Sequence, residues 1–202
     1  MNKGERVDSN GGTSMPVDLL LEACRQGKPG AFDAVVRAHQ DRVYSFCVRM
    51  LSDREEALDA AQEVFLSAYR NLDGFREEAR LSTWLLKIAA NRCLNWIRQR
   101  SARATREVGF PDTEGQEAPP FQPPGPEKDR PERIAENREM GKILEQALSR
   151  IDPDSRRLLL LSDVEGFTYE EVAAMAEIPV GTVKSRIHRA RMALRKFLAP
   201  VV

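Results

Sequence analysis

A cluster of basic side chains near the end of the chain carries the clearest chemical signal. The stretch 178–198, IPVGTVKSRIHRARMALRKFL, has no Asp or Glu between Thr182 and Leu198. The whole chain of 202 residues holds 31 basic and 31 acidic side chains, so positive charge is concentrated here rather than present in excess. Guanidinium and ammonium groups bind phosphates, and arginine, lysine and serine also hydrogen-bond to base edges. The segment therefore predicts a nucleic-acid contact.

The apolar residues of this segment predict how it is held. On a helix starting at Thr182, one face carries Val183, Ile187, Ala190 and Leu194. These are small or branched side chains, which suit packing under another helix better than insertion into a membrane surface. The opposite face then carries Lys184, Ser185, His188, Arg189 and Arg191, which can enter a major groove. A merely solvated basic surface is the alternative interpretation.

A second stretch without acids combines cations with aromatic rings and amides. Residues 80–100 read RLSTWLLKIAANRCLNWIRQR and follow a polar loop that contains Phe75. Bases of single-stranded nucleic acid stack on rings while cations follow the backbone. The rings are Phe75, Trp84 and Trp96, and the exposed amides expected are Asn91 and Asn95. Burial in a core is the alternative for both tryptophans, and we favour it for Trp96.

The acids lie on the preceding stretch. Asp53, Glu55, Glu56, Asp59 and Glu63 gather there, with Gln62 and Phe65 nearby. This surface would repel a duplex. It is either a solvated helix face or a docking site for a basic protein partner.

The elements that must position these residues all read as helices. Apolar residues recur at three- and four-residue steps over Val17–Cys24, Ala31–Leu51, Asp53–Tyr69 and Leu81–Arg98. Ser52 is the expected N-cap of the third of these helices. No stretch alternates as a strand would, so we expect one compact helical bundle in this half.

The middle of the chain predicts a linker. Residues 101–132 contain seven prolines interspersed with Gly, Glu and Gln: Pro111, Pro119, Pro120, Pro123, Pro124, Pro126 and Pro131. Proline removes backbone donors and fixes φ, so we expect an extended, flexible tether. A tether of this length allows two domains to dock on distant surfaces without touching each other.

Helical patterns return after the linker. Ile134–Ile151 is amphipathic, and Asp152-Pro153 is an N-cap followed by proline at the first helical position. Gly166 should end that helix, and Thr168-Tyr-Glu-Glu171 is a capping box that opens a short helix to about Ala176. The turn 177–181 then leads into the basic helix, which is the helix-turn-helix layout.

Other classes of protein fit poorly. The three cysteines lie inside apolar patterns without a CxxC, which predicts buried, reduced thiols and a cytoplasmic protein. No segment approaches the roughly 20 apolar residues that span a bilayer, and residues 1–16 lack the apolar core of a signal peptide. With two histidines, no HExxH and no Gly-rich phosphate loop, we can assemble no catalytic or metal site, and we expect no cofactor. An autonomous helix-turn-helix regulator remains an alternative, although the N-terminal half shows neither a pocket-like pattern nor a heptad seam.

Four stretches together resemble the extracytoplasmic-function sigma factors, the bacterial promoter-specificity subunits of RNA polymerase. They are DAAQEVFLSAYRNLDGF at 59–75, RLSTWLLKIAANRCLNWIR at 80–98, the Pro-rich linker, and FTYEEVAAMAEIPVGTVKSRIHRARMAL at 167–194. One helix-turn-helix would be weak evidence, but this ordered combination is specific to the family. The resemblance implies an all-α fold of two small helical domains and a protein that is not an enzyme.

The resemblance also implies domain limits and partners. A flexible N-terminus would cover 1–15, the region 2 domain 16–100, the linker 101–132 and the region 4 domain 133–199. The implied partners are bacterial core RNA polymerase, promoter DNA in duplex and melted form, and an anti-sigma factor, without insertion of the chain into a membrane.

Site residues follow from the resemblance at matching positions. Docking on core polymerase would involve Asp59, Gln62, Glu63 and Phe65. The melted minus-ten strand would meet Phe75, Arg80, Ser82, Thr83, Trp84, Lys87 and Asn91. The minus-thirty-five duplex would be read by Thr182, Lys184, Ser185, Arg186, His188 and Arg189.

Two positions depart from the family pattern. The turn of the helix-turn-helix usually holds Leu-Gly, whereas this chain has Ala176-Glu177, so a left-handed residue there would be strained or the turn reshaped. An aromatic pair common in the minus-ten loop of relatives is Leu81-Ser82 here. The specificity for an extruded base is therefore expected to differ.

Overall fold

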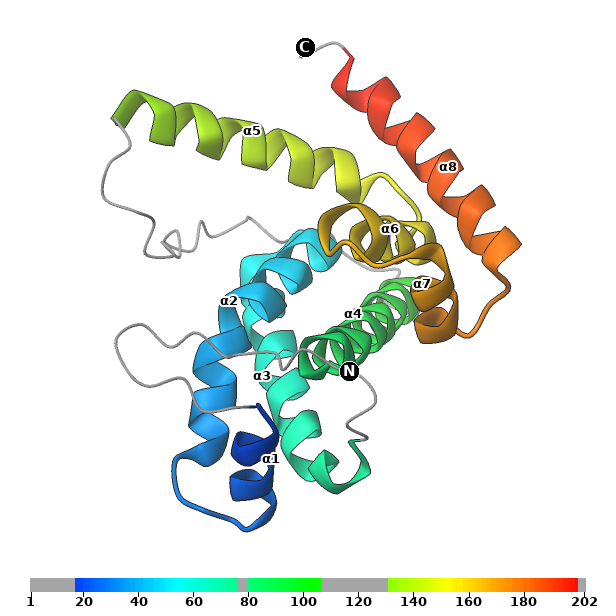
Figure 1. Ribbon diagram of the computed structural model, residues 1–202. Helices are drawn as coiled ribbons and strands as arrows, with labels where there is room; N and C mark the ends of the chain where they lie inside the picture. The colour runs from blue at the N-terminus through cyan, green and yellow to red at the C-terminus, as the bar shows by residue number, and fades with distance from the viewer. Residues whose placement is uncertain (1–16, 76–79, 107–130, 200–202) are drawn as a thin grey trace.

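The computed structural model describes residues 17–75, 80–106 and 131–199, and every regular element in these ranges is helical (Figure 1). The expected flexible N-terminus, 1–15, and most of the expected linker, 107–130, lie outside the described residues. The elements are α1 (Val17–Arg25), α2 (Ala31–Leu51), α3 (Arg54–Arg70), the 3-10 turn η1 (Leu72–Gly74), α4 (Leu81–Arg106), α5 (Pro131–Ser149), α6 (Pro153–Leu159), the π-helical turn η2 (Leu160–Val164), α7 (Tyr169–Ala176) and α8 (Val180–Leu198).

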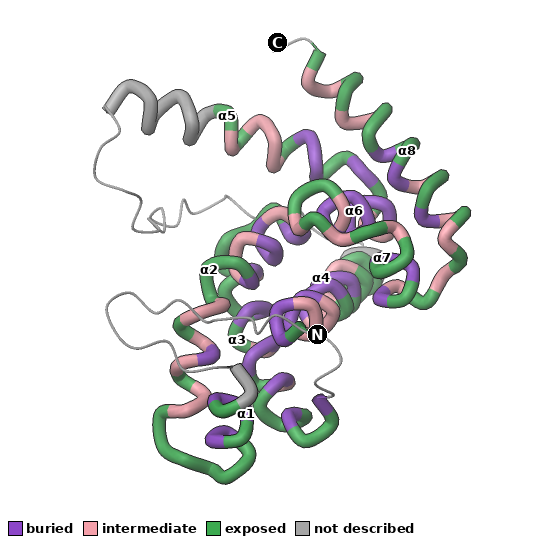
Figure 2. Tube along the Cα trace, viewed as in Figure 1, coloured by how far each residue is buried: buried purple, intermediate pink, exposed green. Residues whose placement is uncertain are grey.

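The apolar stripes predicted for the first half form its core. Helices α2, α3 and α4 pack on one another, and α1 closes one end of the bundle against α2 and η1. On α3 the whole stripe is buried, from Ala57 to Ala68. On α2, Val35, Val43, Phe46 and Cys47 are buried, whereas Phe32 and Val36 are half-buried at its surface. Figure 2 shows that buried positions alternate with exposed and intermediate ones along α2 and α3.

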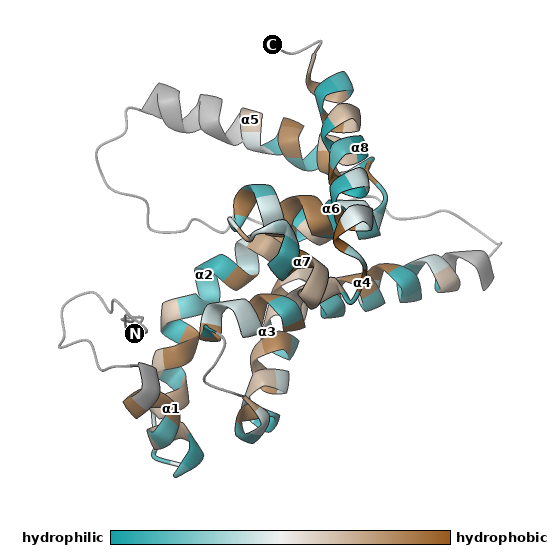
Figure 3. Cartoon of the chain, turned by 45° about the vertical axis from the view of Figure 1, so that its right-hand side comes forward, coloured by the Kyte–Doolittle hydropathy of each residue, from teal (hydrophilic) through white to brown (hydrophobic). Residues whose placement is uncertain are grey.

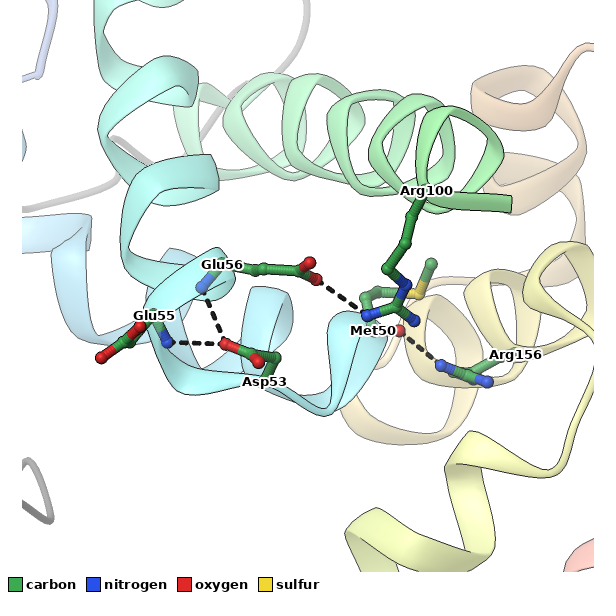
Figure 4. A network of polar contacts seen from close by, with 6 residues as sticks. All are labelled: Met50, Asp53, Glu55, Glu56, Arg100 and Arg156. Carbon is green, nitrogen blue, oxygen red and sulfur yellow. Dashed lines mark hydrogen bonds and ion pairs between the residues drawn. The ribbon is translucent and has the colours of Figure 1, made fainter. Parts of the chain in front are cut away.

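The start of α3 differs from the expectation. The N-cap is Asp53, whose side chain accepts hydrogen bonds from the backbone N–H groups of Glu55 and Glu56, both at 2.9 Å (Figure 4). Ser52 instead ends α2, with a left-handed φ of 58°, and its N–H donates to the Val48 carbonyl. A carboxylate at this position also interacts favourably with the helix dipole. The prediction that Ser52 is the N-cap was therefore wrong by one residue.

The second half follows the predicted capping signals closely. Asp152 accepts a hydrogen bond from the Ser155 N–H, with Pro153 at the first helical position of α6. Gly166 adopts φ 78° after the π-helical turn, and Thr168 and Glu171 form the full capping box of α7. Helices α7 and α8 then make the predicted helix-turn-helix.

The predicted linker is shorter in the structure at both ends. Helix α4 continues to Arg106, and α5 already begins at Pro131. The extension of α4 is SARATR, which contains no proline or glycine and consists mainly of good helix formers. The predicted start of the linker at residue 101 is therefore wrong by six residues.

The two halves of the described chain contact each other, which the tether alone did not predict. Helix α2 packs on α5, and α4 packs on α6, so buried residues of both halves join in one apolar cluster. Arg156 of α6 is 5% exposed and donates hydrogen bonds to the Met50 carbonyl of α2 and to the Ser149 and Ile151 carbonyls of its own half (Figure 4). A guanidinium thus joins two helix ends across the interface.

The three cysteines are free thiols and buried. A hydrogen bond with Cys47, together with burial, raises the pKa of the Cys93 thiol, which keeps it protonated. None of the described helices is long and apolar enough to cross a membrane, and the described residues contain no cluster of three metal-binding side chains.

Candidate nucleic-acid and protein interfaces

Helix α8 presents the basic face that its sequence predicts. Val183, Ile187 and Ala190 are at most 2% exposed and pack on α6 and α7, while Leu194 is half-buried. Lys184, Ser185, His188 and Arg189 are exposed, and Thr182 and Arg186 are half-buried beside them. The helix begins at Val180, two residues before the expected start, because Pro179 takes the N-cap position. The structure thus brings all six predicted duplex-reading residues to one helix.

The side chains of this face are held by local hydrogen bonds. Ser185 donates from Oγ to the Thr182 carbonyl at 3.0 Å, and Arg189 Nε donates to the Ser185 carbonyl at 3.4 Å. Asp152 lies close enough to this face for its positive charges to affect the ionisation of the Asp152 carboxyl group. Burial opposes its ionisation, but hydrogen bonds from Ser155 and the charges of Arg186 and Arg189 lower the pKa of Asp152.

Arg191 differs from the other cations of α8. Its guanidinium makes two hydrogen bonds to Asp163 of η2, at 2.9 and 2.6 Å, and this pairing raises the pKa of Arg191. The sequence placed Arg191 on the exposed face, and the side chain is exposed, but its guanidinium is paired with Asp163. Its role in this structure is to tie the middle of α8 to the turn after α6.

The candidate single-strand surface is only partly exposed. Arg80 and Asn91 are exposed, and Thr83, Trp84 and Lys87 are half-buried. Phe75 and Ser82 are each 5% exposed, so neither offers a surface to a base in this conformation. Phe75 instead packs against Trp84, with ring centroids 5.1 Å apart and planes tilted by 50°, and Arg25 donates to its carbonyl at 3.1 Å. Residues 76–79 of the predicted loop lie outside the described part of the chain.

Side chains of the second half lie on α4. Arg157 Nη1 donates to Asn91 Oδ1 at 3.4 Å, Lys87 Nζ is 3.5 Å from Glu177 Oε1, and Arg98 is 3.7 Å from Asp154. Trp96, expected in the core, is half-buried and packs against the apolar core from its edge, and it also lines a polar cavity of about 290 Å³ between α3 and α4.

The predicted docking residues of α3 divide between two faces. Gln62 and Phe65 line a groove against α2. Glu63 points the other way, toward α4, where its carboxylate is 3.3 Å from Arg92. Asp59 is exposed and does not line this groove. The four residues therefore do not form one patch.

The groove between α2 and α3 contains apolar residues that the sequence reasoning missed. Two adjoining cavities, of about 550 and 590 Å³, share Val36, Gln62 and Phe65. Leu58, Leu66 and Tyr69 are more than half exposed along it. Their signal was present in the sequence, because they are apolar residues out of phase with the buried stripe of α3. Figure 3, coloured by hydropathy, shows apolar positions interspersed with hydrophilic ones along α1, α2 and α3.

Comparison with known proteins gives consistent matches. The family "Sigma-70 region 2" matches residues 35–103, and "Sigma-70, region 4" matches residues 141–194. The chain is 36% identical to the RNA polymerase sigma-H factor of Pseudomonas aeruginosa, over 91% of this chain and 94% of that one. It is 32% identical to the ECF RNA polymerase sigma factor SigW of Bacillus subtilis, over 91% and 97%.

Two solved structures share the fold. The sigma factor RpoE of Bartonella quintana, solved in complex with the anti-sigma factor NepR, has a TM-score of 0.65 at 24% identity, covering 84% of this chain and 98% of that one. CnrH, solved in complex with the cytosolic domain of CnrY, has a TM-score of 0.60 at 21% identity, covering 90% and 96%.

Proposed function

The chain belongs to the ECF sigma factors of the sigma-70 family, which act in transcription initiation, and from this premise we propose how its surfaces divide the work. Helix α8 reads the minus-thirty-five element as duplex, α4 and the loop before it hold the melted minus-ten strand, and the groove between α2 and α3 docks on core RNA polymerase. The observation that carries the proposal is the exposed, acid-free face of α8 above a buried apolar stripe.

The duplex-reading role rests on the geometry of α8. A helix carried by a helix-turn-helix enters the major groove with its N-terminal residues toward the base edges. Lys184, Ser185, His188 and Arg189 occupy that position and are exposed. Thr182 and Arg186 lie beside them, where phosphate contacts fix the register of the protein on the duplex.

The minus-ten role rests on α4. Arg80, Lys87 and Asn91 provide cations and an amide, and Trp84 provides a partly exposed ring. Extruding a base costs a few kcal/mol, which stacking and amide hydrogen bonds can return. Because Phe75 and Ser82 are buried here, their part is to support Trp84 and the start of α4 unless the loop rearranges around DNA. Thr83, which is half-buried, completes the set.

The docking role rests on the apolar groove. Phe65 and Gln62 line it together with exposed leucines, and Asp59 adds negative charge on the same helix. Such a surface suits a helix of the polymerase that presents apolar and basic side chains. Glu63 contributes to docking indirectly, because its carboxylate pairs with Arg92 instead of contacting the polymerase.

An anti-sigma factor is a further partner of the same groove. One structure that shares this fold is a sigma factor in complex with an anti-sigma factor, and another is CnrH in complex with the cytosolic domain of CnrY. The protein works where the polymerase works, in the cytoplasm, and contributes binding rather than catalysis. The domain limits that go with this function are 16–100 for the first domain and 133–199 for the second.

Run-off transcription tests the proposal. Core RNA polymerase, with and without this protein, is given a library of genomic fragments. Specific transcripts that require both components are expected. Duplex binding by the protein alone, without specific transcription in the presence of polymerase, would instead identify an autonomous regulator.

Two substitutions separate the two DNA contacts. Arg189→Ala should weaken protection of the upstream element, and Asn91→Ala should spare that protection while reducing permanganate reactivity of the melted bases. Loss of one good base contact weakens recognition by about 1–3 kcal/mol. If both variants lost protection and melting to the same extent, the assignment of one DNA element to each half would be wrong.

A further inference from the structure

The polar cavity between α3 and α4 lies outside the surfaces to which a role has been assigned. Its volume is about 290 Å³, and α4 provides most of its lining. Arg92, Trp96, Gln99 and Arg103 follow one another at steps of four, three and four residues, which places them on one side of α4. Adjacent residues of a helix point about 100° apart, so this side is separate from the side that carries Asn91. The proposed binding of the minus-ten strand therefore leaves the cavity unused.

Two of the arginines in the lining are held in place by acids of α3. Arg100 Nη1 donates to Glu56 Oε2 at 2.9 Å (Figure 4), and Arg92 Nη1 is 3.3 Å from Glu63 Oε2. All four side chains are partly exposed, so each pair contributes little to stability. A guanidinium has five N–H donors, and one contact with a carboxylate leaves most of them available. The pairs thus present two oriented arginines at the wall of the cavity.

The remaining polar side chains of the lining are not used by the fold. Asn95 and Gln99 are exposed amides, and Arg103 is an exposed cation on the part of α4 that extends beyond its expected end. Within the described part of the chain, none of these three side chains makes a hydrogen bond or an ion pair. Arginines also outnumber glutamates in the lining, so the cavity has positive charge that its own acids do not balance.

Trp96 adds an aromatic wall to this polar lining. The ring is half-buried, packs against the apolar core from its edge and lines the cavity. Bases stack on aromatic rings, side-chain amides hydrogen-bond to base edges, and guanidinium groups bind phosphates. The volume is at the lower end of the range for ligand pockets, which starts at about 300 Å³, so it suits one such unit rather than a larger molecule.

We propose that this cavity binds one nucleotide. The base stacks on Trp96, and its edge meets the amides of Asn95 and Gln99. The phosphate binds Arg100 and Arg103. This inference goes beyond the proposed function and does not depend on it, because the cavity lies on a different side of α4 from the minus-ten contacts.

The nucleotide has two possible sources with the same chemistry. Asn95 follows Asn91 by about one helical turn, so a strand held on the minus-ten side of α4 is able to place its next base in the cavity. A free nucleotide presents the same base and phosphate without a strand. The experiment therefore uses both as probes.

The cavity variant is Gln99→Glu with Arg103→Gln, which removes a cation and adds a carboxylate beside the phosphate. Both side chains are exposed and make no contact that the fold needs, so the stability should be nearly unchanged. Arg37→Gln with Gln146→Glu is the matched control, because it makes the same change of charge at exposed positions outside the cavity. The probes are the four nucleoside 5′-monophosphates, titrated by calorimetry, and a labelled single strand of six nucleotides, titrated by fluorescence anisotropy.

The unmodified chain and the control should bind at least one of these probes with equal affinity. The cavity variant should bind that probe at least about tenfold more weakly, because it loses a base contact and repels the phosphate. A loss measured with the monophosphates identifies a free nucleotide as the occupant, and a loss measured with the strand alone identifies a nucleotide of the strand.

Three results would overturn the inference. They are no binding of either probe, equal affinity of the cavity variant and the control, and inorganic phosphate bound as tightly as the monophosphates, which would mean an adventitious ion only. Run-off transcription by the unmodified chain tests the proposed function separately, so the two hypotheses fail independently.

Discussion

Asp152 is the residue at which local capping and the electrostatics of the candidate DNA-reading face meet. It caps α6 through the Ser155 N–H at 3.0 Å and lies within the field of Arg186 and Arg189. Its pKa is lowered in the folded protein, because these hydrogen bonds and charges outweigh the effect of burial. A carboxylate with a lowered pKa stabilises the fold above its unfolded pKa of about 3.9, and this stabilisation is lost as the pH falls through the folded value.

Asp152→Asn should therefore change how stability depends on pH. Asparagine caps a helix about as well as aspartate, so helix α6 should remain formed. At pH 7 the variant should lose part of the free energy of unfolding, because the favourable charge is gone, and below about pH 4 the difference should shrink. Urea denaturation at both pH values measures it. A difference that grew on acidification would contradict the lowered pKa.

Glu177 makes a second prediction at this scale. Glu177→Gly removes a left-handed strain of about 1–2 kcal/mol but adds about 0.5–1 kcal/mol of backbone entropy in the unfolded chain. The free energy of unfolding should thus rise by less than about 1 kcal/mol. The matched variant Glu177→Ala keeps the strain and loses the carboxylate, so it should not gain stability. Chemical denaturation of both variants checks this, and a less stable glycine variant would show that the turn is not strained.

At the scale of elements, the sequence predicted the helices and their caps well. It predicted less well which side of each helix is buried and which is exposed. The expected limits of α2, Ala31–Leu51, match the structure, because apolar periodicity and flanking glycine are local signals. The burial of Phe75 was not predictable in the same way. Its neighbours in sequence are polar, and it is buried only because Trp84 and Arg25, from other parts of the chain, lie against it.

Helix α3 shows the same limit. The sequence grouped Glu63 with Gln62 and Phe65, although a helix places adjacent residues about 100° apart and so divides them between two faces. The structure adds the missing information, since α2 covers one face and α4 the other. The surface that remains exposed between α2 and α3 is largely apolar. Among the apolar residues of α3, Leu66 is 53% exposed, second only to Tyr69, so a substitution there tests the role of this surface.

Leu66→Asp should weaken docking on the polymerase without changing the stability of the fold. The side chain is exposed, so the free energy of unfolding should change by less than about 0.5 kcal/mol. A carboxylate in the centre of an apolar contact should weaken binding to core RNA polymerase by at least about tenfold, equivalent to about 1.4 kcal/mol. Val164→Asp is the control, since Val164 is 48% exposed and lies outside the groove. If the two variants bound polymerase equally well in a pull-down or by fluorescence anisotropy, the groove would not be the docking surface.

At the scale of the whole molecule, the contact between the halves is the feature that no local pattern reveals. Arg42 and Glu165 are 123 positions apart in sequence, and neither lies in a motif that would pair them. Arg156 is similar. Its position after an N-cap predicted a helical residue, but not that its guanidinium would reach the Met50 carbonyl at the end of α2. Its two terminal nitrogens donate to carbonyl oxygens, although its buried Nε has no hydrogen-bond partner among the described residues. Burying a guanidinium is expensive unless its donors are paired, so the interface depends on the fit of several elements at once.

Arg156→Met should uncouple the two halves. Methionine fills similar space but leaves the Met50, Ser149 and Ile151 carbonyls without this donor, at a cost of about 1–3 kcal/mol for each one that stays unpaired. Both tryptophans of the chain, Trp84 and Trp96, lie on α4, so their fluorescence reports mainly on the first half, whereas far-ultraviolet circular dichroism reports on helices of both halves. In the unmodified chain the two signals should change together on denaturation, because one apolar cluster joins the halves.

In the methionine variant the circular dichroism should begin to fall at lower denaturant than the fluorescence, since the second half loses its own carbonyl contacts as well as the one across the interface. Arg156→Lys is the matched control. It keeps a charge and three donors but lacks the planar fork, so it should separate the two transitions less. Coincident transitions in all three proteins would mean that Arg156 does not couple the halves, and the packing of the two halves would then depend on the apolar cluster that α2, α4, α5 and α6 share.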